Sequence, residues 1–365
     1  MQSENIVNSS TALRKFFKNT SGVFSFGFII LCLFIALFGY VLATDSTSNA
    51  NQMHLEIHSK KPGFKALVLT IPQQLTTQHS FINFLLNGNQ NPPLEFVINS
   101  YNITEKHLNY IPYYEGNLKK EEISLPISTF KNQPIEKFIK TKTFWFGTDK
   151  YGRDLYSRMI IGTRITFFVG FIAVLISLII GVTLGSIAGY FGGKTDVLIQ
   201  WLINVTWSIP TLLLVIAITL ALGKGFWQVF IAVGLTMWVE VARVVRGQVL
   251  SIKKMQYVEA AKVLGFSDTR IIFKHILPNI MAPIIVISAA NFASAILIES
   301  GLSFLGIGAQ PPIPSWGAMI KENYNYIILG KPYLAIIPGM AIMSLVLAFM
   351  LIGNALRDAL DVKTP

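Results

Sequence analysis

The sequence is nearly devoid of cysteine. Cys32 is the only one in 365 residues, and it lies inside the first long apolar run. A disulfide or a cysteine metal cluster within one chain is therefore excluded. Four of the five histidines fall in the polar segment that follows that run, and His275 stands alone near the C-terminal third. Without further ligands at suitable spacing, we predict no metal site.

Charge is also scarce. Only 13% of residues are charged while 52% are hydrophobic, and the mean hydropathy is +0.52. This composition is typical of a membrane protein rather than a soluble one. The net charge of +11 comes mainly from Lys and Arg that flank apolar runs. No basic helix with interleaved aromatic residues is present, so the charge indicates membrane topology rather than nucleic-acid binding.

Catalytic motifs are missing. The sequence contains no phosphate-binding Gly-x-x-x-x-Gly-Lys-Ser/Thr pattern. The glycines of Phe146–Arg158 follow no strand that would place them at a nucleotide, and no catalytic constellation is recognisable elsewhere. We therefore expect a chain that is not an enzyme and that binds no cofactor of its own.

Long apolar runs dominate what is present. A transmembrane helix needs about 20 apolar residues to cross about 30 Å of hydrocarbon. The runs predict an all-α membrane protein with six transmembrane helices at Val23–Ala43, Ile165–Ala188, Val197–Gly223, Phe226–Ala242, Ile280–Ile298 and Tyr333–Ala355. Pro210 should kink the third of them.

The flanking charges predict the orientation of these spans. Arg14, Lys15 and Lys18 place the N-terminal segment, residues 1–22, in the cytoplasm. The first span, residues 23–43, is too long for a typical signal-peptide core, so we expect an uncleaved anchor. An even number of spans returns the tail, residues 356–365, to the cytoplasm.

Residues 44–145 differ in kind from the spans. They are rich in Asn, Gln, Ser, Thr and Pro, with short apolar pieces at Lys65–Ile71 and Phe81–Leu86. We predict a small mixed strand-and-helix insertion on the extracytoplasmic side. An alternative is a membrane-anchored enzyme or sensor with this segment as its working domain.

Residues 146–164 predict a short amphipathic helix at the membrane surface, ahead of a permease-like core at 165–355. Asp149 is placed to cap that helix. Asp154 and Arg158 are four residues apart, a spacing that allows an ion pair on one helix face.

A polar, basic hairpin interrupts the apolar core within residues 247–279. Tyr257, Ala261 and Leu264 are spaced to share one face of a short helix, which the small Ala260 and Ala261 leave low enough for another protein to approach. Gly265 should end this helix in a left-handed conformation. Ser267 or Asp268 should cap a second short helix that Pro278 ends. The alternative is an ordinary cytoplasmic loop.

Small residues recur within the spans. Gly181, Gly185 and Gly189 repeat every four residues, and Ala289 and Ala293 do the same further along. Such stripes let helices pack closely, either within the chain or against a second subunit.

Glu240 is costly in hydrocarbon and should face protein or water. Arg243, one turn away, could form an interfacial salt bridge with it, or the pair could line a cytoplasmic gate.

Four segments resemble one family of transporters. The hairpin's Glu-Ala-Ala…Gly…Ile-Leu-Pro pattern resembles the EAA loop of ABC-importer permeases, although His275 stands where the generic motif has Ile. The other segments resemble the dipeptide/oligopeptide branch, and they are Phe146–Arg158, Glu299–Gly317 and Gly353–Asp361. The resemblance covers about 60% of the chain and does not include the insertion.

The resemblance implies a type I ABC importer transmembrane domain, the second of two homologous permease subunits in a bacterial inner membrane. Two ATPase subunits, which would hold the ATP and Mg, and an extracytoplasmic substrate-binding protein would be its partners. The implied ATPase-coupling contacts are Tyr257, Glu259, Ala260, Ala261, Leu264 and Gly265.

Other functions stay open on the sequence. Very similar subunits import nickel or antimicrobial peptides, and specificity rests largely with the binding protein. An ion channel or secondary transporter is a different class of candidate. It should carry charged or broken helices at the membrane midplane, which these spans lack apart from Pro210.

Overall fold

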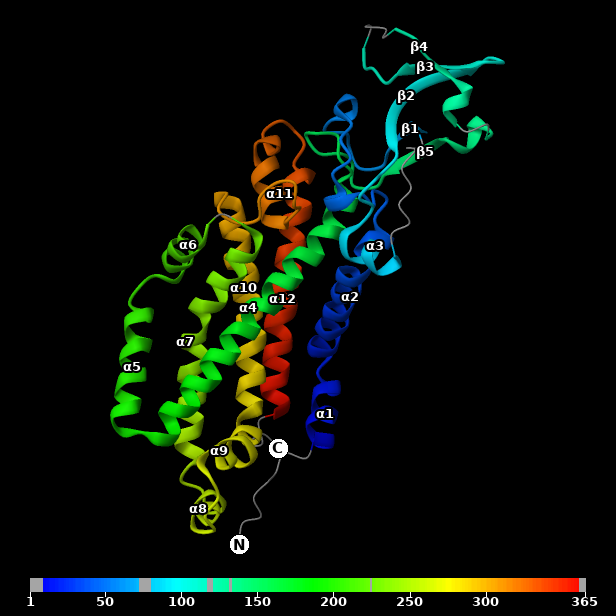
Figure 1. Ribbon diagram of the computed structural model, residues 1–365. Coiled ribbons are helices and arrows are strands. Elements are labelled where there is room, and N and C mark those ends of the chain that lie inside the picture. The colour runs from blue at the N-terminus through cyan, green and yellow to red at the C-terminus, as the bar shows by residue number, and fades with distance from the viewer. Residues whose placement is uncertain (1–8, 72–79, 117–120, 131–132, 224, 361–365) are drawn as a thin grey trace. The chain divides into compact units, whose positions relative to one another are not determined.

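The computed structural model describes residues 9–71, 80–116, 121–130, 133–223 and 225–360 (Figure 1). Within these ranges, five helices are long and apolar enough to cross a membrane, and a bent helix pair makes six if it crosses as one span. The five spans are Thr20–Leu42, Leu155–Phe191, Trp227–Ile252, Asp268–Leu305 and Tyr333–Leu360. The chain divides into two compact units.

The first unit comprises Met1–Leu33, Thr166–Gln310 and Met340–Pro365. Its helices are α1 (Ser9–Lys18), the first part of α2 (Thr20–Leu42), most of α4 (Leu155–Phe191), α5 (Gly193–Trp207), α6 (Thr211–Leu222), α7 (Phe226–Ile252), α8 (Gln256–Val263), α9 (Asp268–Ile271), α10 (Met281–Leu305) and most of α12 (Tyr333–Leu360).

Close helix packing forms the core of this unit. The α4 glycines lie against α7: a Cβ added at Gly181 would be 2.5 Å from the Cβ of Val241. Elsewhere, the rings of Phe292 on α10 and Phe349 on α12 stack with centroids 3.9 Å apart. Close approach at the glycines on one side and ring stacking on the other hold these spans together by van der Waals packing.

The predicted third span is broken rather than kinked. α5 and α6 meet at an angle of 91°. Pro210 precedes α6 with φ −53° and ψ 123°, which is outside the helical region. Proline has no N–H for the helical ladder and its ring clashes with the preceding turn, so a full break replaces the bend we expected.

The second unit comprises Phe34–Ile165 and Pro311–Gly339. It contains a five-stranded antiparallel sheet in the order β4-β3-β2-β1-β5. The strands are β1 (Phe64–Ile71), β2 (Leu94–Ile103), β3 (His107–Pro112), β4 (Ile123–Pro126) and β5 (Ile139–Phe144), accompanied by α3 (Phe81–Asn87) and α11 (Trp316–Asn323).

Alternation along the interior strand β1 explains why the sheet is covered on both faces. Ala66 and Val68 belong to one core cluster with Phe144, whereas Leu69 belongs to another with Leu108. Successive side chains of a strand point to opposite faces, so an apolar run of this kind needs cover on both sides. The apolar piece Lys65–Ile71 thus builds the core of the sheet, whereas Phe81–Leu86 forms α3, which has no buried residue.

The expected surface helix over residues 146–164 is wrong in its boundaries. α4 begins at Leu155 and runs unbroken into the span. Residues before it form a turn in which Asp149 Oδ1 accepts from the N–H groups of Tyr151 (2.8 Å) and Arg153 (3.0 Å). Asp149 therefore closes a loop instead of capping a helix.

Candidate functional site: the hairpin and its anchors

The hairpin begins with α8, and Gly265 ends that helix as predicted. Gly265 has φ +76°, and its N–H donates to the Lys262 carbonyl (2.9 Å) while the Phe266 N–H donates to the Ala261 carbonyl (3.1 Å). These two bonds define a Schellman cap, which needs a left-handed residue at that position. The turn between α8 and α9 is therefore fixed by backbone geometry.

The helix face that packs inward differs from the face we expected to be open. Ala261 is buried, and Tyr257 is half-buried against a core that also contains Val258 and Ile271. A buried Ala261 has little surface to offer a partner, because the hairpin uses that face to attach to its own chain. The prediction that Tyr257, Ala261 and Leu264 share one open helix face is therefore wrong at Ala261, while the coupling role of Tyr257 stays a prediction.

Four other members of the implied contact set lie outward. Glu259, Ala260, Leu264 and Gly265 are exposed. Val263, which sequence reasoning missed, is 88% exposed, and Leu264 is 71% exposed. Val263 and Leu264 thus form a small exposed apolar patch at the hairpin tip.

Pro278 does not end a separate second helix, contrary to expectation. α9 continues through a π-helical turn (Ile272–Ile276) and a 3-10 turn (Leu277–Ile280) into α10. Proline cannot donate to the carbonyl one turn earlier, so the backbone changes its winding locally. The Asn279 side chain donates to the His275 carbonyl (2.7 Å), which satisfies one of the freed groups.

Ser267 occupies the N-cap position of α9 with an extended backbone but makes no side-chain cap bond. Asp268 instead accepts from the hydroxyl of Tyr190, at 2.6 Å. Tyr190 lies at the end of α4 and is buried. Lys253 donates to the Tyr190 carbonyl, and Lys262 of α8 lies 5.0 Å from the Tyr190 ring centroid. Tyr190 thus touches both short helices of the hairpin.

His275 packs against an aromatic side chain within the hairpin. Its ring stacks on Phe266 at 5.9 Å with 22° between the planes, and the Arg270 guanidinium lies 4.0 Å from the Phe266 centroid. The residue that departs from the generic motif therefore serves as a stacking partner inside the hairpin.

A second polar contact joins α5 to α7. Arg246 binds both carboxylate oxygens of Asp196, at 2.5 and 2.6 Å. Two parallel bonds of this kind fix orientation as well as distance. The pair links α5 to the stretch of α7 that leads into the hairpin.

Glu240 and Arg243 are both exposed. The Arg243 guanidinium lies 3.5 Å from the ring centroid of Trp207, and within the described ranges no ion pair joins it to Glu240. The tight bend after α5 brings Trp207 into reach, which is a contact that i,i+3 spacing could not reveal.

The small residues face neighbours within the chain. Added Cβ atoms would lie 2.5 Å from the Ala242 carbonyl oxygen at Gly185 and 2.8 Å from the Val249 Cβ at Gly189. Ala289 faces Gly353 of α12, whose added Cβ would lie 3.4 Å from it, and Ala293 is buried. These stripes thus form intrachain α4–α7 and α10–α12 contacts.

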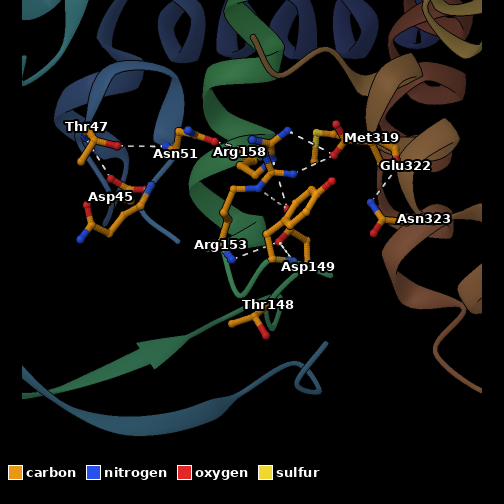
Figure 2. Close-up of polar contacts among 12 residues, drawn as sticks. Asp45, Thr47, Asn51, Thr148, Asp149, Arg153, Arg158, Met319, Glu322 and Asn323 are labelled. Carbon is orange, nitrogen blue, oxygen red and sulfur yellow. Dashed lines mark hydrogen bonds and ion pairs between the residues drawn. The ribbon is translucent and has the colours of Figure 1, made fainter. Parts of the chain in front are cut away.

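A buried charge cluster in the second unit was only partly foreseen. Arg153 donates to Asp149 at 2.6 Å and to Glu322 of α11 at 2.8 Å. Figure 2 shows these residues with Arg158, whose guanidinium approaches Asp149 (3.6 Å) and Glu322 (3.7 Å). Asp154, the partner expected for Arg158, accepts instead from Ser157 at 2.5 Å and from Thr44.

Comparison with known proteins agrees with these features. The family model described as binding-protein-dependent transport system inner membrane component matches residues 181–364. The model of the N-terminal transmembrane domain of oligopeptide transport permease C matches residues 9–62. Residues 63–180, which contain the sheet, lie outside both matches.

Curated relatives are similar over a large part of their length. The dipeptide transport permease DppC of Alkalihalophilus pseudofirmus is 44% identical over 60% of this chain and 72% of its own. The oligopeptide permease OppC of Bacillus subtilis is 40% identical over 61% and 73%. The glutathione permease GsiD of Pectobacterium atrosepticum is 42% identical over 60% and 72%. A solved structure of the MetNI methionine ABC transporter is 16% identical, with a TM-score of 0.48 over 57% of this chain and 98% of that one.

The described residues form a multi-pass helical membrane protein with a capped hairpin between two of its spans. The chain belongs to the family of binding-protein-dependent transport system inner membrane components, with the N-terminal domain typical of oligopeptide transport permease C. The predicted resemblance to ABC-importer permeases is confirmed.

Proposed function

We propose that this chain is the second permease subunit of a type I ABC importer for di- and oligopeptides, forming half of the translocation path. The names of its relatives support this, since they refer to dipeptides, oligopeptides and glutathione, which is itself a short peptide. A homologous permease supplies the other half of the path.

The proposed orientation puts the hairpin and both termini in the cytoplasm of a bacterium, with the inner membrane as the site. Lys262, Arg270 and Lys274 on the hairpin support it, because short cytoplasmic loops are enriched in Lys and Arg. The sheet is then extracytoplasmic, on the side from which a binding protein delivers substrate.

The exposed hairpin tip carries the proposal. Val263 and Leu264 present aliphatic surface at the end of a helix that Gly265 closes and a buried core supports. Two ATPase subunits dock there and on the sister permease. ATP binding closes the ATPase pair, the hairpins move with it, and the spans shift between inward-open and outward-open populations.

Co-purification tests the docking site. We would solubilise membranes in detergent and compare the wild-type chain with Glu259→Lys and Gly265→Val. Glu259→Lys reverses a charge on the exposed tip, and a valine at φ +76° strains the cap. The wild type should recover ATPase and sister permease, and both variants should lose the ATPase alone.

The matched control is Gly247→Ala. Gly247 lies in α7, and a Cβ added there meets nothing within 4 Å. This variant should retain both partners. If the wild-type chain purifies without partners under every nucleotide condition, the importer proposal is contradicted. An ion channel, or a membrane-anchored enzyme or sensor, would then have to be considered again.

Substrate class needs a transport assay. Proteoliposomes with the complete complex should accumulate labelled dipeptides only when ATP is supplied. Uptake of nickel or of antimicrobial peptides in place of dipeptides would keep the architecture and change the cargo. Uptake without ATP would favour a channel or secondary transporter.

A further inference from the structure

The short helix α3 exposes an unusual amount of apolar surface. All seven of its residues are described and none of them is buried. Phe81, Ile82 and Leu86 are 65%, 68% and 57% exposed. Several large apolar side chains gathered on one exposed element indicate an interaction surface. The helix lies in the connection between β1 and β2, in the part of the chain that neither family model matches.

This helix is amphipathic. Ile82 and Leu86 are four residues apart and share one face, with Phe81 at its edge. Asn83 and Asn87 are also four residues apart and form a separate polar stripe, in which the Asn87 amide donates to the Asn83 side-chain oxygen at 2.6 Å. A helix with one apolar and one polar stripe suits the plane of a membrane–water boundary.

Packing against the end of α2 fixes the level of α3. The Phe84 ring centroid lies 6.5 Å from that of Tyr40, which belongs to the last turn of α2 (Figure 1). Phe84 packs against the buried cluster that contains Tyr40. Gly88 follows α3 with φ +70°, and a Cβ added there would lie 2.5 Å from a ring carbon of Tyr40. The two helices are therefore in direct contact at this end of the span.

Hydrogen bonds hold α3 at the same level. The Arg164 guanidinium of α4 donates to the Leu85 carbonyl at 2.7 Å. The Ser48 hydroxyl, in the segment that follows α2, donates to the Asn87 carbonyl at 2.9 Å. These two bonds tie α3 to α4 and to the chain that leaves α2.

The end of α2 marks a boundary of the membrane. α2 is one of the five helices long and apolar enough to span it, and its apolar sequence is followed by Thr44 and Asp45. Val41 and Leu42 in its last turn are exposed aliphatic side chains that lipid can cover. Tyr40 suits this level, because tyrosine is enriched where hydrocarbon meets the headgroups. α3 therefore lies at the depth of that boundary.

We propose that α3 is a membrane anchor that lies in the bilayer surface, with Phe81, Ile82 and Leu86 among the phospholipid acyl chains. Lipid is the occupant that its position favours, since α3 is tied to the end of a span and its polar stripe can stay in the headgroup layer. The helix then attaches the β1–β2 connection, and with it the sheet, to the bilayer. This anchoring requires only that α2 spans the membrane, whichever side its C-terminal end faces.

Spin-label accessibility tests the anchor on the full chain in nanodiscs of phosphatidylcholine and phosphatidylglycerol. Labels attached to Ile82→Cys and Leu86→Cys should collide more with oxygen, which partitions into lipid, than with a water-soluble nickel chelate. The ratio of the two collision rates should be several-fold higher there than at Lys65→Cys, an exposed position on β1. Cys32 is buried, so the wild-type chain supplies the background signal.

A matched pair of charge substitutions separates insertion into lipid from a general disturbance of the helix. Ile82→Asp places a carboxylate on the apolar face and should lower the ratio at the Leu86 label several-fold. Asn83→Asp adds the same charge on the polar stripe and keeps the acceptor for Asn87, so the ratio should stay unchanged. If both substitutions change the ratio equally, or if neither changes it, the proposal is overturned.

Two other results would contradict the lipid contact. If the labels at Ile82 and Leu86 give the same ratio as the label at Lys65, α3 lies in water. If neither oxygen nor the nickel chelate reaches them, protein rather than lipid covers this face. ATPase co-purification does not depend on α3, so either result leaves the proposed function intact.

Discussion

The hydroxyl of Tyr190 donates a 2.6 Å hydrogen bond to the carboxylate of Asp268. Tyr190 lies at the end of the membrane-spanning helix α4, and Asp268 begins the second helix of the hairpin. In the proposed function, this bond is a direct connection between the docking element and α4.

Removing that bond should weaken coupling without removing the ATPase. Tyr190→Phe keeps the ring that Lys253 and Lys262 approach but loses the hydroxyl. Because a hydrogen bond to a charged group contributes about 1.5–3 kcal/mol, we expect about a tenfold loss of substrate moved per ATP hydrolysed. Reconstituted transport and ATPase rates measured together give this ratio.

A double-mutant cycle separates the bond from general damage. Asp268→Ala alone and the double variant with Tyr190→Phe should each show about the same loss as Tyr190→Phe. If the losses add, or if the complex no longer assembles with Tyr190→Phe, then Tyr190 does not act on coupling through its hydrogen bond to Asp268.

The contact between α4 and α7 predicts a stability change at Gly185. A Cβ added there would lie 2.5 Å from the backbone oxygen of Ala242, which cannot rotate away. Gly185→Ala should therefore separate the helices and cost about 1–3 kcal/mol. Thermal denaturation in detergent checks this, with Gly301→Ala as control, since an added Cβ at Gly301 meets nothing within 4 Å. Equal melting temperatures for the two variants would contradict the packing.

The charge cluster of the second unit predicts a large effect at Glu322. Glu322→Gln leaves Arg153 and Arg158, both about 2% exposed, with less negative charge around them. Breaking a buried ion pair costs about 3–5 kcal/mol, and the 15% exposure of Glu322 places it near the lower figure. Hydrogen exchange should quicken around residues 149–158. As a control, replacing the exposed Glu136 by Gln should leave exchange there unchanged. If Glu322→Gln also leaves exchange unchanged, the charge cluster does not stabilise this region.

Lowering the pH should destabilise the sheet, because Glu95 then becomes protonated. Burial alone would raise its pKa, but the interactions with His54 and Lys142 outweigh it, so the pKa falls below the ordinary value of 4.5. A lowered carboxyl pKa stabilises the fold fully above pH 4.5, and that stability is lost as the pH falls through the folded value.

Measuring exchange of the β2 and β5 amides between pH 6 and 3 tests this expectation. Glu95→Gln should remove most of the acid-dependent change, whereas exposed Glu105→Gln should retain it. An unchanged pH profile in Glu95→Gln would assign the acid sensitivity to other carboxylates.

Local sequence patterns were sufficient to predict several features of the structure. Apolar runs located five of the spans, because crossing lipid requires length and hydropathy that any continuous run displays. Gly265 was predicted as a helix stop because only glycine enters the left-handed region easily. The hairpin motif led to the family, because it is long and lies within one uninterrupted stretch of the chain.

The sequence by itself thus determined the membrane class, the spans, the hairpin and its glycine cap, all of which depend on residues near one another in the chain. Only the tertiary structure decided that Ala261 faces inward, that α5 and α6 bend by 91°, and that Arg153 reaches a glutamate 169 residues away. Helical spacing relates residues three or four apart and carries no information about which face meets which neighbour. Partners such as Tyr190 and Asp268, 78 residues apart, are chosen by the packing of whole helices.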